Sequence, residues 1–439
     1  MYSPDSQSLL HLNDKDGLFP PSFYAATAIG DRTRETFHGT IDAEVGIIGG
    51  GYTGLSAALN MAKRGRDVVV LDAHRMGWGA SGRNGGQVAS GYNRGQGVLE
   101  AIMGPQKARD AFAIAVQAAR LVKDLIYQYN IPAHFKSGLL YANHRRRFDA
   151  DSVRYVARLN EDYDYGQIRY VSPEELASMV GTRCYSGATL DMGGGHIHPL
   201  NYALGLANAA ENAGARLFDR SEVLGVKGDN PHLLSTVTGT LRVKTLIYAC
   251  NGYLGRLEPR IAAKVMPINS FMVATEPLGA AQARSLIRDD VAVADSRFVV
   301  RYFRLSHDNR LLFGGREAYS YRFNRQLKRF AAVPMVRTFP QLRDVRIDYG
   351  WGGTLGITRS RLPDFAQLGP HTYSLSGYSG SGIAMATMAG KIMADTLDGN
   401  RQNFDTMATM PTKPFPGGMA MRKPLLFTAM HGYALRDRF

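Results

Sequence analysis

Three glycines at a fixed spacing carry the strongest chemical signal in this chain of 439 residues. Gly49, Gly51 and Gly54 form a GxGxxG pattern, with Tyr52 and Thr53 between them. In such a pattern the first glycine permits a tight turn, the second lets the backbone approach a pyrophosphate, and the third lets a helix pack closely on a strand. Free amide groups at the start of that helix favour an anion. The pattern therefore predicts a dinucleotide site formed by these five residues.

An acidic residue stands at the end of the next apolar run. Asp72 lies 18 residues after Gly54 and is followed by Ala73. A carboxylate at this position accepts a hydrogen bond from a ribose hydroxyl, and it would repel the 2′-phosphate of NADP. The spacing therefore favours NAD or FAD, with Asp72 and Ala73 in contact with the cofactor.

A second glycine-dense loop, residues 77–87, decides between these two cofactors. A nicotinamide cofactor does not require such a loop, whereas the flavin end of FAD extends beyond the first unit and needs close contact with backbone. We expect Ser81 and Arg83 to bind the pyrophosphate, and the backbone of residues 84–87 to run under the isoalloxazine ring. The loop therefore predicts FAD, bound by Ser81, Gly82, Arg83, Asn84, Gly85, Gly86 and Gln87.

The elements around these residues form one βαβ unit. Residues 44–48 and 67–71 are apolar runs, and residues 55–62 between them have helical spacing. A strand, a tight turn, a helix and a second strand within about 30 residues are typical of a parallel sheet. Between residues 265 and 313 short apolar runs instead predict an antiparallel sheet. Further helices are predicted at residues 107–129, 173–176, 201–213 and 383–397, and further strands at 246–250, 271–273, 298–300, 311–313 and 373–376.

Composition excludes several other classes of protein. The net charge is +14, but the basic residues are scattered and no nucleic-acid-binding motif is present. The charge attracts an anionic substrate or cofactor, or it has no specific role. Cys184 and Cys250 lie far apart without metal spacing, and the N-terminal region has no apolar signal segment. These features favour a cytoplasmic protein without a disulfide framework. The uncharged stretches at residues 45–62 and 370–390 are broken by glycines and do not predict membrane spans.

The chain resembles the D-amino-acid-oxidase/glycine-oxidase superfamily of FAD enzymes, and within it the gamma-glutamylputrescine oxidase branch. The resemblance begins near residue 42 and covers nearly all of the remaining chain. It is carried by the cofactor pattern described above and by the motifs at residues 79–87, 195–200, 309–315, 338–342, 377–380, 414–418 and 435–438.

This resemblance implies an α/β (α+β) fold in which a Rossmann-type FAD-binding domain is interleaved with a smaller, mostly antiparallel β-sheet substrate domain. It assigns residues 42–95, 195–264 and 345–400 to the FAD-binding domain, and residues 96–194 and 265–344 to the substrate domain. Residues 1–41 would form an N-terminal arm and residues 401–439 a C-terminal tail. It also implies a non-covalent flavin, because neither cysteine stands where the covalent members of the superfamily carry theirs.

Two later segments are expected to meet the cofactor again. The glycine-rich loop before the last predicted helix offers backbone N–H groups to the flavin edge as it is reduced. By the resemblance, Val223 lies near the adenine, and the strand end at residues 249–253 passes the cofactor. The expected contacts are Val223, Cys250, Asn251, Gly252, Tyr378, Gly380, Ser381 and Gly382, with Tyr253 facing the substrate.

Five other residues are candidates for the substrate pocket. His196 and His198 alternate, so we expect one to face the flavin and the other to pack; without a third ligand they do not predict a metal site. Ser381 and Arg301 depart from the branch, whose members usually have histidine and an acid at these positions. An Arg301 that faces the pocket would favour a carboxylate, and otherwise it points to solvent. Trp351 either walls the pocket or belongs to the core.

The resemblance implies an FAD-dependent amine oxidase. The flavin would take a hydride from the carbon beside a neutral amine, the imine would hydrolyse to an aldehyde, and oxygen would reoxidise the flavin to give hydrogen peroxide. A gamma-glutamylputrescine-like amine is the expected substrate. Arg301 motivates an alternative, a secondary amino acid such as pipecolate, proline or sarcosine. The basic and apolar residues 419–439 motivate a second alternative, a dehydrogenase docked to a membrane or a partner.

Overall fold

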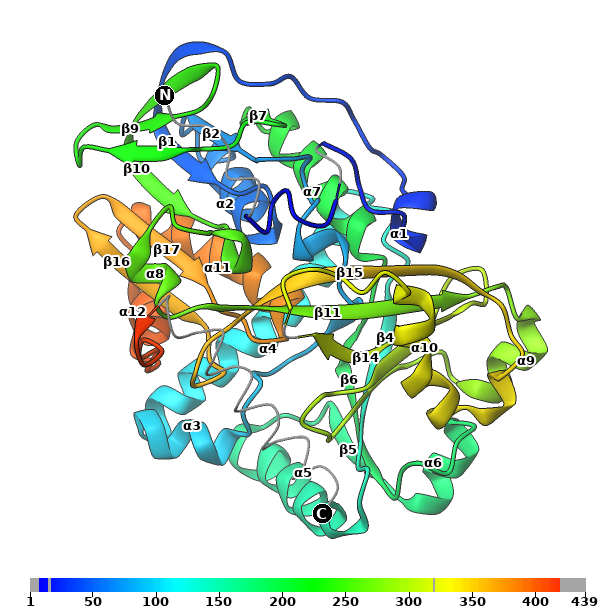
Figure 1. Ribbon diagram of the computed structural model, residues 1–439. Coiled ribbons are helices and arrows are strands. Elements are labelled where there is room, and N and C mark those ends of the chain that lie inside the picture. Colours follow the sequence, from blue (N-terminus) through cyan, green and yellow to red (C-terminus); the bar gives the residue numbers. More distant parts are fainter. Residues whose placement is uncertain (1–7, 15–16, 319, 419–439) are drawn as a thin grey trace.

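The computed structural model describes residues 8–14, 17–318 and 320–418. Two sheets with helices packed between and around them form the molecule (Figure 1). One contains the predicted βαβ unit, and the other is the predicted antiparallel sheet. The fold class is therefore the expected one: a Rossmann-type FAD-binding domain with a second domain.

The first sheet has eight strands, in the order β16-β17-β10-β1-β2-β7, with the β8-β9 pair attached to β10. Strands β17, β10, β1, β2 and β7 are parallel, whereas β16, β9 and β8 are antiparallel additions. The strands are β1 (Gly39–Ile48), β2 (Val68–Leu71), β7 (Arg216–Phe218), β8 (Gly225–Lys227), β9 (His232–Ser235), β10 (Gly239–Tyr248), β16 (Asp364–Gly369) and β17 (Thr372–Ser376).

Helices bury one face of this sheet. The centre of the layer is α2 (Tyr52–Ala62), which contacts both α7 (Pro199–Asn212) and α11 (Gly382–Leu397). These helices are rich in alanine and glycine, so their backbones approach closely; a Cβ at Gly390 would lie 2.4 Å from the backbone nitrogen of Ala57. The long helix α4 (Pro105–Gln128) packs on α11 and joins the same core.

The second sheet has nine strands, in the order β15-β11-β14-β13-β12-β4-β6-β3, with β5 attached to β6. Every pair is antiparallel except β4 with β12, so the predicted sheet type is correct for most of it. The strands are β3 (Gln87–Val88), β4 (Lys136–Ala142), β5 (Ile168–Val171), β6 (Ala188–His196), β11 (Met266–Thr275), β12 (Ala292–Asp295), β13 (Tyr302–Leu305), β14 (Leu311–Ala318) and β15 (Ile347–Ile357).

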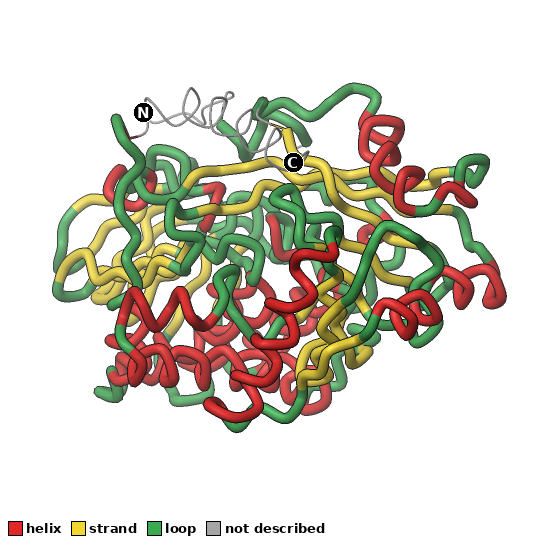
Figure 2. The backbone as a smooth tube through the Cα atoms, turned by 90° about the horizontal axis from the view of Figure 1, so that it is seen from below, coloured by secondary structure: helices red, strands yellow, loops and turns green. Residues whose placement is uncertain are grey.

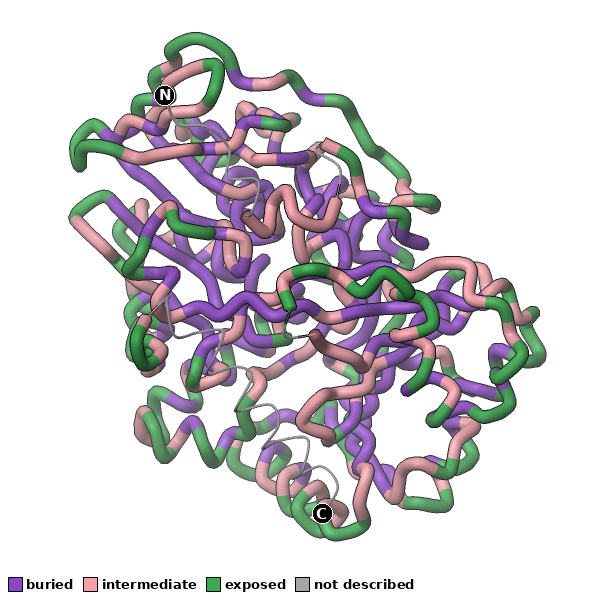
Figure 3. The backbone as a smooth tube through the Cα atoms, viewed as in Figure 1, coloured by how far each residue is buried: buried purple, intermediate pink, exposed green. Residues whose placement is uncertain are grey.

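The remaining helices lie mostly outside the two sheets. In Figure 3 much of the strand backbone is buried, whereas α3 and α5 at the bottom of the view mix exposed, intermediate and buried residues. Figure 2, from below, shows helices gathered on one side and long strands running along the other. The helices not described above are α1 (Phe23–Ala26), α3 (Gln96–Met103), α5 (Asp149–Tyr163), α6 (Pro173–Met179), α8 (Pro259–Ala262), α9 (Gly279–Leu286), α10 (Leu327–Thr338) and α12 (Gln402–Ala408).

The sheets place some residues differently from the sequence prediction. Strands β3 and β15 belong to the second sheet, although residues 42–95 and 345–400 were assigned to the FAD-binding domain. Helix α4 packs in the core of the first domain instead of the second. Residues 298–300 form a bend, not the predicted strand. A pattern of apolar residues does not reveal which of the two sheets a strand joins.

Candidate functional site

A cavity of about 1430 Å³ opens where β1, β2, β10 and β17 end. Ile48, Leu71 and Ala249, at or just beyond three of these strand ends, contribute to its wall. In open α/β sheets, ligands bind outside the carboxyl ends of the strands. The cavity therefore lies at the position that the fold predicts for a dinucleotide.

The three glycines of the pattern each stand where a side chain would clash. Gly49 has a φ of 109°, and a Cβ there would lie 2.8 Å from the carbonyl oxygen of Ala249. A Cβ at Gly54 would lie 2.0 Å from the carbonyl oxygen of Gly49, so only glycine lets α2 start so close to β1. Gly51 caps α2 and lines the cavity with Gly49, Tyr52 and Thr53, whereas Gly54 lies behind the wall.

Asp72 lies at the end of β2 and faces the same cavity, next to Ala73. Its Oδ2 accepts a hydrogen bond from the backbone nitrogen of Gly50 at 2.6 Å, and its Oδ1 accepts one from that of His74 at 2.8 Å. Burial raises the pKa of the Asp72 carboxyl. The two backbone bonds fix the carboxylate and leave lone pairs for a ribose hydroxyl.

The second glycine loop contributes only part of its length to the cavity wall. Ser81, Asn84, Gly85 and Gln87 line the cavity. Gly82 and Gly86 are packed against neighbouring backbone, because a Cβ at either would lie 2.4 Å from the carbonyl oxygens of Gly77 and Ile197 respectively. The Nε2 atom of Gln87 is buried without a hydrogen-bond partner in the part of the chain that the structure describes.

Arg83, which was expected to bind the pyrophosphate, lies outside the cavity wall. Its guanidinium forms an ion pair with Asp14 at 2.7 Å, donates to the carbonyl oxygen of Trp78 at 2.7 Å and stacks 4.1 Å from the Trp78 ring. The Arg83 side chain is 1% exposed and is absent from the cavity wall. Its charge is balanced by a carboxylate of the N-terminal arm, so a pyrophosphate role is not supported.

The N-terminal arm covers the cavity, which the sequence did not reveal. Residues 8–10 line its wall beside Val223. His11 bonds the carboxylate of Glu222 at 2.8 Å, and the side chain of Asn13 bonds the backbone of Tyr321 and Phe323. No cofactor motif falls on the arm, and its partners lie far away in sequence, so local patterns carry no signal for it.

His198 is a helix cap rather than a pocket residue. Its Nδ1 accepts from the backbone nitrogen of Asn201 at the start of α7, and its Nε2 is 3.0 Å from Thr27 Oγ1. Burial lowers the pKa of His198 to about 3, so the ring is neutral and Nε2 carries the proton. His196 bonds the carbonyl oxygen of Asp290 at 2.7 Å. Neither histidine lines the cavity, so the expectation that one faces the flavin is not supported.

Arg301 faces away from the cavity as well. Its Nη1 donates to Thr338 Oγ1 at 3.0 Å, on the side of the second sheet covered by α10. Side chains alternate along a strand, so Tyr302 takes the opposite face; a Cβ at Gly85 would lie 2.6 Å from its ring. Arg304 shares that face and donates to the carbonyl oxygen of Gly85 at 2.8 Å. Tyr302 and Arg304, which the sequence did not single out, are therefore the residues here that lie against the glycine loop.

The other predicted residues divide between the wall and the core. Trp351 is 2% exposed, lies outside the wall and donates from Nε1 to the carbonyl oxygen of Arg83 at 2.9 Å. Ser381 precedes α11 and is also outside the wall. The predicted residues that do line the cavity here are Val223, Cys250, Asn251, Gly252, Tyr253, Tyr378, Gly380 and Gly382.

Hydrogen bonds join these wall residues from distant segments. Tyr378 and Thr53 hydroxyls lie 2.6 Å apart, linking the β17 loop to α2. The Asn251 side chain accepts from the backbone nitrogen of Gly377 at 3.0 Å. The Tyr253 hydroxyl accepts from the backbone nitrogen of Thr354 at 3.1 Å. The wall is therefore fixed by bonds from both sheets.

The described residues contain neither a metal-binding cluster nor a membrane-spanning helix. Among residues 8–14, 17–318 and 320–418, no group of three or more His, Cys, Asp or Glu side chains could hold a metal ion. Within the same ranges, no helix combines the length and apolar character needed to cross a membrane.

The fold and the cavity define a two-domain, dinucleotide-binding oxidoreductase. The family model described as FAD dependent oxidoreductase (DAO) matches residues 44–396. The chain belongs to this family and uses FAD as its cofactor. This confirms the cofactor and the family predicted from residues 49–54, 72 and 77–87.

Individual proteins similar to this chain agree with that assignment. It is 38% identical over 426 residues to gamma-glutamylputrescine oxidoreductase of Escherichia coli K12, covering 95% of this chain and 98% of that one. It is 39% identical over 419 residues to the probable oxidoreductase OrdL of Rhizobium meliloti, covering 95% and 97%. The crystal structure of glycine oxidase from Geobacillus kaustophilus shares the fold, with a TM-score of 0.69 at 21% identity, covering 82% of this chain and 95% of that one.

Proposed function

We propose that this chain oxidises the carbon–nitrogen bond of a small, gamma-glutamylputrescine-like amine. The observation that carries the proposal is the match to gamma-glutamylputrescine oxidoreductase over 95% of the chain. Bound FAD would accept a hydride from the carbon beside the neutral amine; the imine would hydrolyse to an aldehyde, and oxygen would take the electrons to give hydrogen peroxide.

The residues of the cavity fit FAD in two places. Gly49 and Gly51 line the cavity at the start of α2, where their backbone is open to a pyrophosphate. Asp72 holds a carboxylate toward the expected ribose. We therefore propose that these residues bind the diphosphate and the ribose, and that the wall from Ser81 to Gln87 supports the flavin end.

The flavin is proposed to be non-covalent. Cys250 lines the cavity, but its Sγ contacts the carbonyl oxygen of Ile48 at 3.2 Å, and burial raises the pKa of the thiol to about 12. A thiol that stays protonated is a poor nucleophile. Cys184 lies outside the cavity wall. Denaturation should therefore release FAD into the supernatant.

The chain's own residues would position the substrate and exclude water. Tyr253 and Gln87 line the cavity, and Tyr302 lies against Gly85 at its edge. The arm residues 8–10 cover another part of the wall. A fixed wall of this kind raises the rate by holding the reacting C–H bond in one orientation.

The described residues support neither of the two alternatives, an amino-acid substrate and a docked dehydrogenase. A carboxylate-bearing amino acid as substrate rested on Arg301, whose side chain bonds Thr338 on the other face of the sheet. Docking to a membrane or partner rested on residues 419–439, which lie outside the described residues. An amine remains the substrate that we propose.

An anaerobic screen tests the proposal. The purified protein, saturated with FAD, is mixed with gamma-glutamylputrescine, putrescine, sarcosine, proline and pipecolate while flavin absorbance is followed. We expect rapid bleaching with gamma-glutamylputrescine and peroxide release when oxygen is admitted. Bleaching by none of the amines would refute the proposal. Bleaching without peroxide release would show that the electron acceptor is not oxygen.

A further inference from the structure

The first described residues of the N-terminal arm lie against the cavity, outside both sheets. Ser8, Leu9 and Leu10 line its wall together with Val223, the residue expected near the adenine. The family model matches residues 44–396, so this segment precedes the part of the chain that defines the family. A site that the family fold provides is therefore covered by an additional piece of this chain.

The arm is anchored to the loop that carries the expected ribose carboxylate. His74 is fully buried, and its Nε2 donates to the carbonyl oxygen of Leu10 at 2.8 Å. Its Nδ1 accepts from the backbone nitrogen of Gly17 at 3.1 Å. The backbone nitrogen of His74 donates to Asp72 Oδ1 at 2.8 Å. One residue therefore binds both the arm and the carboxylate that faces the cavity.

Two further side chains of the same segment continue this anchor. The Trp78 ring stacks on that of His74, with the ring centres 3.8 Å apart, and its Nε1 donates to the carbonyl oxygen of Leu18 at 2.8 Å. The Arg83 guanidinium lies 4.1 Å from the centre of the Trp78 ring and pairs with Asp14 at 2.7 Å. His74, Trp78 and Arg83 thus form one cluster of stacked side chains, each of which holds a part of the arm.

The Asp14–Arg83 ion pair is well enclosed. The side chain of Arg83 is 1% exposed and that of Asp14 is 11% exposed. Removing one partner of a buried pair is costly, because the other charge is left uncompensated. Arg83 Nη2 already lacks a hydrogen-bond partner within the described part of the chain. The guanidinium therefore depends on Asp14, and the pair fixes the arm beside the glycine loop.

The arm is also joined to a second segment of the cavity wall. Asn13 Nδ2 donates to the carbonyl oxygen of Tyr321 at 2.7 Å, and Asn13 Oδ1 accepts from the backbone nitrogen of Phe323 at 2.8 Å. Tyr321 itself lines the cavity. From strand β11, Asn269 donates to the same Tyr321 carbonyl oxygen at 3.0 Å. The arm and this loop therefore form one joined cover.

We propose that residues 8–14 form a clasp over the adenosine end of bound FAD, which opens when the cofactor enters or leaves. The contacts of the clasp are bonds to side chains outside the strand ladders, so they can break while both sheets stay intact. In the closed state residues 8–10 complete the cavity wall. The clasp acts on FAD exchange whichever amine is oxidised, so it does not depend on the proposed substrate.

The variant Asp14→Asn keeps the shape of the side chain and removes its charge. Release of FAD from the full-length holoenzyme is followed by flavin fluorescence after dilution, and uptake by mixing the full-length apoprotein with FAD. We expect both rates to rise by roughly 10- to 100-fold, because a hydrogen bond to a charged group is lost. Asp14→Glu, which keeps the charge, should restore slow exchange in part.

The two rates together separate a clasp from general damage to the site. A cover that opens more often speeds entry and release alike. A site that is merely distorted releases FAD faster but takes it up more slowly. Equal melting temperatures of the FAD-saturated variants are not needed for this distinction, because the sign of the change in uptake decides it.

The matched control is Asp31→Asn. Asp31 also belongs to the arm and pairs with Arg75 at 2.7 Å, but neither residue lines the cavity. Its exchange rates should equal those of the wild type. Asn13→Ala is a second variant of the clasp itself. It loses neutral hydrogen bonds, so both rates should rise by about 2- to 10-fold.

The clasp is overturned if Asp14→Asn and Asn13→Ala exchange FAD no faster than Asp31→Asn. It is also overturned if release becomes faster while uptake becomes slower. Asn13→Ala alone decides if Asp14→Asn does not fold. None of these outcomes bears on the proposed amine oxidation, which is measured separately as flavin reduction in FAD-saturated wild-type protein.

Discussion

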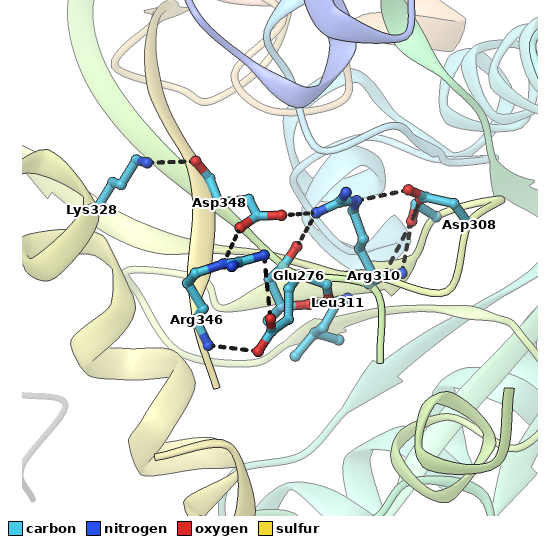
Figure 4. Close-up of polar contacts among 9 residues, drawn as sticks. Glu276, Asp308, Arg310, Leu311, Lys328, Arg346 and Asp348 are labelled. Atoms are coloured by element: carbon cyan, nitrogen blue, oxygen red, sulfur yellow. Dashed lines mark hydrogen bonds and ion pairs between the residues drawn. The ribbon is translucent and has the colours of Figure 1, made fainter. Parts of the chain in front are cut away.

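The two ends of the strand pair β11–β14 differ in how their charged side chains are paired. At one end, Arg310 binds Asp308 at 2.7 Å and Asp348 at 2.5 Å, and Arg346 binds Asp348 at 2.8 Å (Figure 4). At the other end, Glu317 has no such partner among the described residues. The paired charges stabilise the sheet, whereas Glu317, which is partly exposed, contributes no ion pair to it.

The largest expected effect comes from filling the space between the glycine loop and Tyr302 of β13. In Gly85→Val, the Cβ would lie 2.2 Å from Gln87 Oε1 and 2.6 Å from the Tyr302 ring. A displacement of about 1 Å at a reacting centre costs roughly 100-fold in rate. Anaerobic flavin reduction should slow by about that factor. Gly91→Ala, where a Cβ meets no atom within 4 Å, should leave the rate unchanged.

Neutralising the unpaired charge should stabilise the protein. The pKa of Glu317 in the fold is about 7, above its ordinary value of 4.5, so the folded state loses stability as pH rises between these values. Glu317→Gln removes that penalty. At pH 8 its free energy of unfolding in urea should exceed that of the wild type by about 2 kcal/mol. A destabilised variant would show that the fold itself uses the carboxylate.

Removing a paired charge should instead destabilise the protein. Arg310→Met leaves Asp308 and Asp348 without their main cation, and we expect the free energy of unfolding to fall by about 1–2 kcal/mol. Arg346→Met is the matched control: its side chain is 70% exposed, so the loss should be smaller than for Arg310→Met. Neither change should alter the rate of flavin reduction. A large loss of activity in Arg310→Met would mean that the paired end of β11–β14 is coupled to the cavity at the other end.

What could be predicted from the sequence depends on how far apart in the chain the interacting residues lie. Gly49, Gly51 and Asp72 were found because their roles depend on neighbours within one βαβ unit. The opposite faces of Arg301 and Tyr302 depend on strand register, and the Arg83–Asp14 pair joins residues 69 positions apart. The role of His198 as a cap was hidden because the usual capping side chains are Ser, Thr, Asp and Asn. The isolation of Glu317 is an absence of partners, which only the assembled sheet reveals.

The smallest expected effect is a pH dependence at the paired end. Hydrogen bonds from Arg310, and then from Arg346, lower the pKa of Asp348 below its ordinary value of 3.8. Its contribution to stability is therefore complete above that value and is lost as pH falls through the lower value in the folded state. The stability difference between the wild type and Arg310→Met, measured by urea unfolding from pH 6 downward, should shrink below about pH 4. For Glu317→Gln the difference should instead grow between pH 4.5 and 7. If both differences changed in the same pH range, the two ends of the strand pair would not be distinct in charge state.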